Sequence, residues 1–170
     1  MRINTNVQDV LNKQINAEFW SAYMYLSMSI WFENRGLKGF ANWMRVQFQE
    51  ETTHALKLLD YVSSRQGIVT LEPIQQVPTE WTSILSVMET IYEHELKVTE
   101  LIYNCQEVAE TEKDRATVSM LKWFVDEQIE EEANVDNIIN QLELIGENGQ
   151  AIYLLDKELA TRVFVDPTVA

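Results

Sequence analysis

The sequence predicts an all-α fold, a four-helix bundle with one long crossover connection and a short fifth helix at its C-terminal end. Three observations indicate this. The chain has 170 residues, 46% of them hydrophobic, which suits one domain with a sizeable core. Only 5 glycines and 3 prolines occur, so turns are few and the elements between them are long. Apolar residues recur at spacings of three and four along four long segments, which is the period of an α-helix. We therefore expect a single domain over residues 1–170.

The first two helices are joined by a short connection. We expect the first from about Val7 to Asn34, with Gly36 as a left-handed cap after it. The second is expected from about Lys38 to Gln66, ending at Gly67. Because only about four residues join them, the two helices should be antiparallel neighbours.

The third and fourth helices have recognisable start signals. The third is expected from about Ser83 to Ala109, with Thr82 as its N-cap. The fourth is expected from about Glu112 to Ile145, opened by Thr111-Glu-Lys-Asp114, which is similar to a capping box with Asp in place of Glu. Gly146 should end it, so the bundle covers about residues 7–146.

The connection between the second and third helices decides the topology. Residues 68–81 contain Pro73 and Pro78 and should not be helical. About 14 extended residues reach roughly 46 Å, and a 27-residue helix is about 40 Å long. This segment can therefore run the length of the bundle and make the third helix parallel to the second. A short fifth helix is expected over about residues 150–159, followed by an irregular tail at 163–170.

Each bundle helix has an apolar row that polar residues interrupt near its middle. The interrupting residues, in chain order, are Glu18, Gln47, Glu51, His54, Glu95, Gln128 and Glu131. Four carboxylates would thus share one layer of a dry core, which costs several kcal/mol for each unpaired charge. A bound pair of cations removes this cost, and oxygen ligands with one imidazole suit divalent iron, manganese or zinc. Glu51 and His54, three residues apart, lie on one helix face.

Several of these residues also have ordinary interpretations. A single glutamate in an apolar row is usually a surface residue, and the acidic run at 127–132 would normally be a solvated helix face. His94 lies about 100° off its row, so we expect it at the surface or at an interface. Cys105 lies on an apolar row and is expected in the core. The coincidence of four interruptions at one depth favours a metal site.

Composition excludes several functions. With 13 basic and 27 acidic residues the net charge is −14, which excludes a generic nucleic-acid binder and favours the approach of cations. One cysteine excludes a disulfide framework within the chain and a cysteine-rich metal site. Residues 1–10 lack the apolar stretch of a signal peptide, and no run of 18 apolar residues exists. We therefore expect a cytoplasmic protein that does not enter a membrane.

The combination of Glu18, Glu51-Thr-Thr-His54, Glu95 and the segment 123–132 resembles the non-haem bacterial ferritins. The resemblance covers nearly the whole chain, including Val77-Pro78-Thr79 in the crossover. It implies a ferritin-like homo-oligomeric shell of 24 subunits. The shell would oxidise Fe(II) with dioxygen or peroxide at a di-iron ferroxidase centre inside each subunit, and would store the Fe(III) as mineral.

The resemblance also assigns ligands to the two irons of that centre. Glu18, Glu51 and His54 would hold the first iron, and Glu51 would bridge to a second iron held by Glu95 and Glu131.

Further residues match positions around this pair. Glu50, Glu127 and Glu130 match a third iron site that shares Glu131. Gln128 would lie on the oxygen-binding side of the pair. Tyr25 and Trp123 match aromatic residues beside the centre that supply electrons or hydrogen bonds. Tyr25 and Gln128 are therefore the candidate catalytic residues.

Haem is not expected. In the related bacterioferritins a methionine after the helix-two glutamate binds haem, and the fourth helix carries Glu-x-x-His. Here the first position is Thr52, and the second reads Glu127-Gln-Ile-Glu130.

Other interpretations remain open from the residues. The protein could store or buffer metal without useful oxidation, or be a structural helical oligomer whose polar layer fixes the register. A dodecameric miniferritin would place its iron sites between subunits. The ligands predicted here lie inside one bundle, which argues against that assembly. The fifth helix, with Ile152, Leu155 and Leu159 at helical spacing, either lines a fourfold axis, as the resemblance implies, or caps the bundle end.

Overall fold

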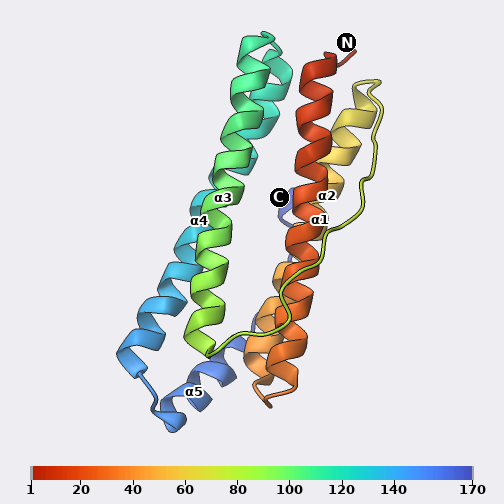
Figure 1. Cartoon of the computed structure of the whole chain (residues 1–170). Coiled ribbons are helices and arrows are strands. Elements are labelled where there is room, and N and C mark those ends of the chain that lie inside the picture. Colours follow the sequence, from red (N-terminus) through yellow and green to blue (C-terminus); the bar gives the residue numbers. More distant parts are fainter. Residues whose placement is uncertain (1, 170) are drawn as a thin grey trace.

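Four long helices run alongside one another, and a fifth lies across one end of the bundle (Figure 1). The structure is a computed structural model and describes residues 2–169. Its helices are α1 (Thr5–Glu33), α2 (Lys38–Ser64), α3 (Ile84–Thr111), α4 (Arg115–Ile145) and α5 (Gly149–Leu159). The tail holds one 3₁₀ turn at Pro167–Val169, and the described residues form no strand. The predicted all-α bundle is confirmed, and none of the helices in the described part of the chain carries a long enough apolar stretch to cross a membrane.

The predicted starts of α3 and α4 lie one and three residues too early. The N-cap of α3 is Ser83 and not Thr82, because Ser83 and Ser86 satisfy each other's backbone N–H groups in a capping box. Helix α4 begins at Arg115 and not near residue 112. Its N-cap is Asp114, which accepts a hydrogen bond from the Thr117 N–H at 3.2 Å.

Backbone conformation explains the ends of α1 and α2. Gly36 has a φ of +74°, as expected of a glycine after a helix end. Gln66 also has a positive φ, +57°. Helix α2 therefore ends at Ser64, two residues earlier than predicted.

Side chains of α1 hold the crossover in place. Asn12 donates to the carbonyl of Ile68 and accepts from the N–H of Thr70, at 2.9 and 3.0 Å. Further along, the hydroxyl of Ser27 donates to the carbonyl of Pro78 at 2.7 Å. An extended segment has no hydrogen bonds of its own, so these bonds satisfy its backbone. The crossover runs along α1 from one end of the bundle to the other, which makes α3 parallel to α2, as predicted (Figure 1).

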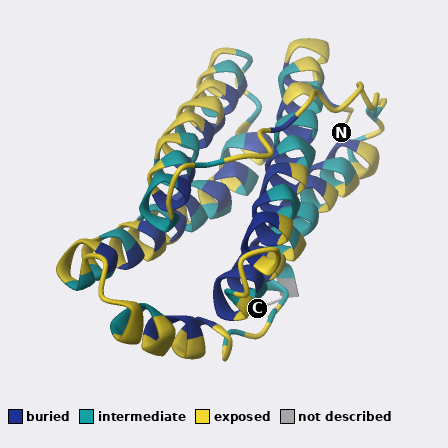
Figure 2. Cartoon of the chain, turned by 60° about the horizontal axis from the view of Figure 1, so that its bottom comes forward, coloured by how far each residue is buried: buried dark blue, intermediate teal, exposed yellow. Residues whose placement is uncertain are grey.

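The bundle interior holds two apolar clusters rather than one. One includes Phe32, Phe40 and Met88 and lies toward the end that α5 covers. The other includes Leu11, Ile102 and the predicted core residue Cys105. Figure 2 shows the buried residues on the faces that the helices turn toward one another. The polar residues that interrupt the apolar rows belong to neither cluster, so they separate the two halves of the core.

Helix α5 is attached to the start of α2 by a buried aspartate. The N-terminus of α2 has no side-chain cap of its own. Asp156 of α5 supplies one, because its Oδ1 accepts from the N–H groups of Gly39 and Phe40 at 2.8 and 3.0 Å. A Cβ at position 39 would lie 1.6 Å from the Asp156 carbonyl oxygen, so only glycine allows this approach. Within one subunit, α5 therefore closes the end of the bundle.

Candidate metal centre

Each long helix contributes at least one acidic side chain to a single buried layer. Glu18 comes from α1, Glu95 from α3 and Glu131 from α4, while α2 contributes Glu51 and His54. These five residues and the neighbouring glutamines are at most 5% exposed. A helix turns 100° per residue, so one polar position in each apolar row suffices to build this layer.

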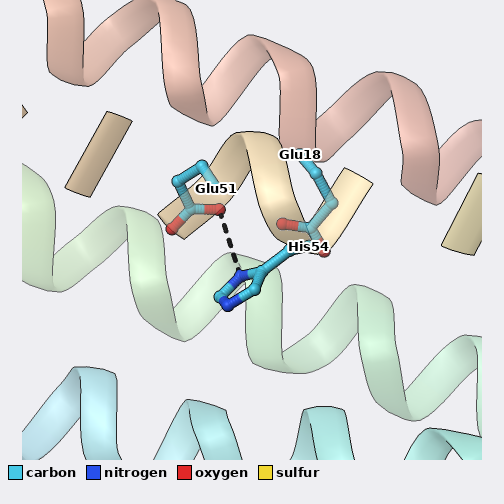
Figure 3. Close-up of side chains that lie close together, drawn as sticks. All are labelled: Glu18, Glu51 and His54. Carbon is cyan, nitrogen blue, oxygen red and sulfur yellow. Dashed lines mark ion pairs between the residues drawn. The ribbon is translucent and has the colours of Figure 1, made fainter. Parts of the chain in front are cut away.

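One compact group of possible ligands is formed by Glu18, Glu51 and His54 (Figure 3). One ligand atom from each lies within 4.8 Å of the other two, a spacing that suits a shared metal ion. The Nδ1 atom of His54 is 3.7 Å from Oε2 of Glu51, the residue one turn before it. The i, i+3 spacing predicted from the sequence thus turns both side chains toward Glu18.

A second group uses the other side of the same imidazole. His54, Glu127 and Glu131 also have ligand atoms that all lie within 4.8 Å of one another. The Nε2 atom of His54 is 3.9 Å from Oε2 of Glu127. His54 is therefore the residue common to both groups, whereas the resemblance assigns the bridging role to Glu51. Glu95 is buried in the layer but belongs to neither group.

Glutamine amides orient three of the carboxylates. Gln14 donates to Glu18 and Gln47 donates to Glu131, each at 2.8 Å. Gln128 donates to Glu95 Oε2 at 3.2 Å. Neutral donors fix a carboxylate without cancelling its charge, so the layer keeps its capacity to bind cations.

Tyr25 is directly joined to this layer. Its hydroxyl donates a 2.5 Å hydrogen bond to Oε1 of Glu95, and its ring is completely buried. Its ring centroid also lies 6.5 Å from that of Trp43. The candidate catalytic residues therefore both donate to the Glu95 carboxylate, Tyr25 from α1 and Gln128 from α4.

Three side-chain atoms in the layer have no hydrogen-bond partner. They are Oε2 of Glu18, Oε1 of Gln47 and Nε2 of His54, and all three are shielded from solvent. Buried polar atoms are rarely left in this condition. Carboxylate oxygens and an imidazole nitrogen are ligands that divalent transition metals prefer, so the donor set fits such an ion.

The carboxylates of the buried layer repel one another. Burial raises the pKa of Glu51 well above its usual range, and repulsion from Glu95 and Glu18 adds to this. Burial raises the pKa of Glu95 to about 7 and also raises that of Glu131. Burial lowers the pKa of His54 to about 4, which leaves its imidazole neutral near pH 7 and able to bind metal. Cations would relieve the repulsion between these carboxylates.

The residues matched to a third iron site are arranged less tightly. Glu50 is partly buried and forms a 2.7 Å ion pair with Arg162. Glu127 faces His54, whereas Glu130 is exposed and belongs to no compact group of possible ligands among the described residues.

Other singled-out residues lie around the centre. Trp123 packs against His54, with ring centroids 5.4 Å apart. His94 is partly buried between α1 and α3, where its Nε2 is 2.7 Å from Ser21 Oγ and its ring contacts Trp20. It takes no part in either ligand group.

Two contributors were missed by sequence reasoning. Gln14 lies four residues before Glu18, so helical spacing could have revealed it. The ion pair from Arg162 to Glu50 had no sequence signal, because it depends on how the chain turns after α5.

Comparison with known proteins decides the family. The ferritin-like domain family matches residues 8–145. The chain belongs to the ferritin family. A bacterial non-heme ferritin of Bacteroides fragilis is 42% identical over 160 residues, which cover 94% of this chain and 99% of that protein. One from Staphylococcus aureus is 36% identical, covering 95% and 98%.

Solved ferritin structures share the fold closely. An open-pore ferritin of Archaeoglobus fulgidus superposes with a TM-score of 0.93 at 51% identity, covering 95% of this chain and 98% of that one. A closed form of the same ferritin, engineered by mutagenesis, gives 0.95 at 51% identity, covering 96% and 99%. The resemblance inferred from sequence is confirmed, and membership of this family supports iron storage.

Proposed function

We propose that this ferritin-family protein oxidises Fe(II) at a di-iron centre within each subunit and stores the Fe(III) product as a mineral. One observation carries the proposal. Four carboxylates and one imidazole, supplied by four different helices, are buried in one layer, and three of their ligand atoms lie within 4.8 Å of one another. Such a layer is costly without cations and favourable with them.

The chemistry follows from pairing the substrate ions. Two Fe(II) ions release two electrons together, which with two protons reduce dioxygen to hydrogen peroxide. Two electrons and two protons likewise reduce hydrogen peroxide to water. Adjacent ions can supply both electrons at one place. Carboxylates attract Fe(III) more strongly than Fe(II), because attraction grows with cation charge, so this donor set favours the oxidised product.

Within this scheme the ligands keep the roles that the resemblance implies. Glu18, Glu51 and His54 would bind the first Fe(II), and Glu95 with Glu131 would bind the second. Tyr25 and Gln128 would hold Glu95 in position and present a hydroxyl and an amide to the oxidant.

Product iron must leave the centre. Glu127, Glu130 and Glu50 would receive a third ion on its way to storage. The net charge of −14 would favour cation approach and mineral nucleation. A homo-oligomeric shell of 24 subunits in the cytoplasm completes the proposal, supported by the likeness to ferritins over nearly the whole chain.

The test is aerobic addition of Fe(II) to the purified metal-free protein, with ferric product followed by absorbance. The wild-type protein should form it much faster than buffer, and Glu51→Ala with His54→Ala should abolish the fast phase while leaving the oligomer intact. Glu93→Ala with Glu100→Ala is the matched control, since it removes two exposed acids of α3. Oxidation no faster than in buffer would show the enzymatic proposal to be wrong.

A further inference from the structure

A positive side chain from the C-terminal segment reaches the acidic residues beside the metal centre. Arg162 lies just after α5, and its Nη2 donates to Oε2 of Glu50 at 2.7 Å. Both side chains are mostly buried, at 22% and 16% exposure. Glu50 directly precedes Glu51 in the sequence, so this ion pair lies one residue from the buried layer.

Residues of α2 fix the position of this arginine. The side-chain amide of Asn42 donates to the carbonyls of Leu159 and Arg162, at 3.2 and 2.9 Å. The guanidinium carbon lies 4.6 Å from the ring centroid of Trp43. Figure 1 shows the C-terminal end of the chain returning from α5 toward the middle of the bundle. Arg162 is therefore held by its backbone, its ring contact and its ion pair together.

The same guanidinium has unused binding capacity and space beside it. Its Nη1 atom is buried without a hydrogen-bond partner. A pocket of about 290 Å³ lies beside Arg162, and its other lining residues include Trp43, Asn134, Asn137, Ile138 and Gln141. The packing therefore leaves open space next to this residue.

The charge of Arg162 acts on two of the acids. Burial raises the pKa of Glu50 and that of Glu131, and the charge of Arg162 opposes this rise in both acids. A guanidinium and a divalent cation compete for the same carboxylate oxygens, and they repel each other at close range. Arg162 thus occupies a position that a cation at Glu50 would need.

We propose that Arg162 is a built-in competitor for the third cation, and that this cation must displace it from Glu50 in order to bind among Glu50, Glu127 and Glu130. The inference rests on the proposed function, because it assumes that the third ion is substrate leaving the paired site. Competition from Arg162 lowers the affinity of these three acids for the third ion, so that the ion can leave again. Displacement also frees the C-terminal segment from one of its attachments to α2.

Calorimetric titration of the metal-free oligomer with Zn²⁺, which does not change oxidation state, tests the competition. In Arg162→Gln the third zinc per subunit should bind about fivefold more tightly than in the wild type, the upper end of the range for one partly exposed charge pair. Binding of the first zinc, at Glu18, Glu51 and His54, should be unchanged, because the charge of Arg162 acts on none of these residues. Arg162→Lys should restore weaker binding. Arg35→Gln is the matched control, because Arg35 also stands over a tryptophan ring, at 3.7 Å, and pairs with a glutamate, Glu80, at 3.6 Å.

Hydrogen exchange of the backbone amides of residues 160–166 gives a second test. It reports whether the C-terminal segment is released, and it does not depend on a change in zinc affinity. In the wild type exchange should accelerate as the third zinc binds, and in Arg162→Gln it should be fast without zinc. Glu50→Gln should also accelerate it, which keeps the test valid if Arg162→Gln folds poorly.

The two proposals fail in different ways. If two zinc ions bind tightly to the wild type, but the affinity for the third is the same in the wild type and in Arg162→Gln, this inference alone is overturned. A wild-type protein that binds no zinc pair overturns the proposed function, and this inference with it.

Discussion

The hydroxyl of Tyr25 on α1 donates a 2.5 Å hydrogen bond to Glu95 on α3, in the centre of a core that is otherwise apolar on both sides. A buried phenol and a buried carboxylate satisfy each other here, and Gln128 of α4 binds the same carboxylate. Three helices are thus joined at one residue. Perturbing this contact tests whether the buried layer serves chemistry or only packing.

Tyr25→Phe removes the hydroxyl and little else. We expect Fe(II) oxidation to slow about tenfold, because one hydrogen bond of about 1.4 kcal/mol corresponds to a factor of ten in rate. Stopped-flow absorbance of the ferric product measures this. Tyr23→Phe on the same helix is the control, since Tyr23 is 51% exposed. Equal rates in both variants and the wild type would exclude a role for Tyr25 in the reaction.

The acidic layer should make the metal-free protein less stable as pH rises. The folded-state pKa of Glu95 is raised to about 7 from 4.5, so its contribution is fully present below about pH 4.5 and lost as pH rises through 7. His54 acts oppositely, because its pKa is lowered to about 4 from 6.5 and its contribution is lost as pH falls through 4. Between pH 7 and 8 only the carboxylate effect remains.

Glu95→Gln isolates this effect. At pH 8 the metal-free variant should be more stable than the wild type, by on the order of 2–3 kcal/mol. Its thermal midpoint should also fall less between pH 5 and 8. Glu93→Gln, an exposed neighbour on α3, should behave as the wild type. Parallel pH profiles for Glu95→Gln and the wild type would contradict the strain assigned to the layer.

The contact between α5 and α2 predicts that alanine substitution of two glycines will affect the attachment of α5 very differently. Gly39→Ala should detach α5, because the new Cβ would overlap the Asp156 carbonyl. Gly149→Ala, whose Cβ meets nothing within 4 Å, should not. Hydrogen exchange over residues 149–159 measures the detachment.

Asp156→Ala should weaken the same contact by about 1 kcal/mol, as for the loss of other helix caps. If Gly39→Ala left exchange in α5 unchanged, the attachment described here would be wrong.

The helices and the acidic layer could be predicted because both depend on local spacing. Apolar residues three and four apart define each helix face, and Glu18, Glu51, Glu95 and Glu131 interrupt those faces at one depth. Helix starts were less predictable, since Thr82 and Ser83 are both acceptable caps and only the reciprocal bonds with Ser86 decide between them.

Contacts between segments that are far apart along the chain could not be predicted from the sequence. The attachment of Asp156 to Gly39 and the pairing of Arg162 with Glu50 depend on the direction in which the chain leaves α4 and α5. Neither residue belongs to a motif or a periodic row that would indicate its partner. The glutamines that orient the carboxylates are an intermediate case, because their helix face is predictable and the acid they bind is not.

Diffraction at the iron absorption edge, from crystals of the protein grown anaerobically with ferrous salt, tests the central claim most directly. The account predicts two neighbouring anomalous peaks inside each subunit, one among Glu18, Glu51 and His54 and one beside Glu95 and Glu131. It would be contradicted by these side chains gathered around an interior without iron, with the anomalous signal confined to the subunit surface.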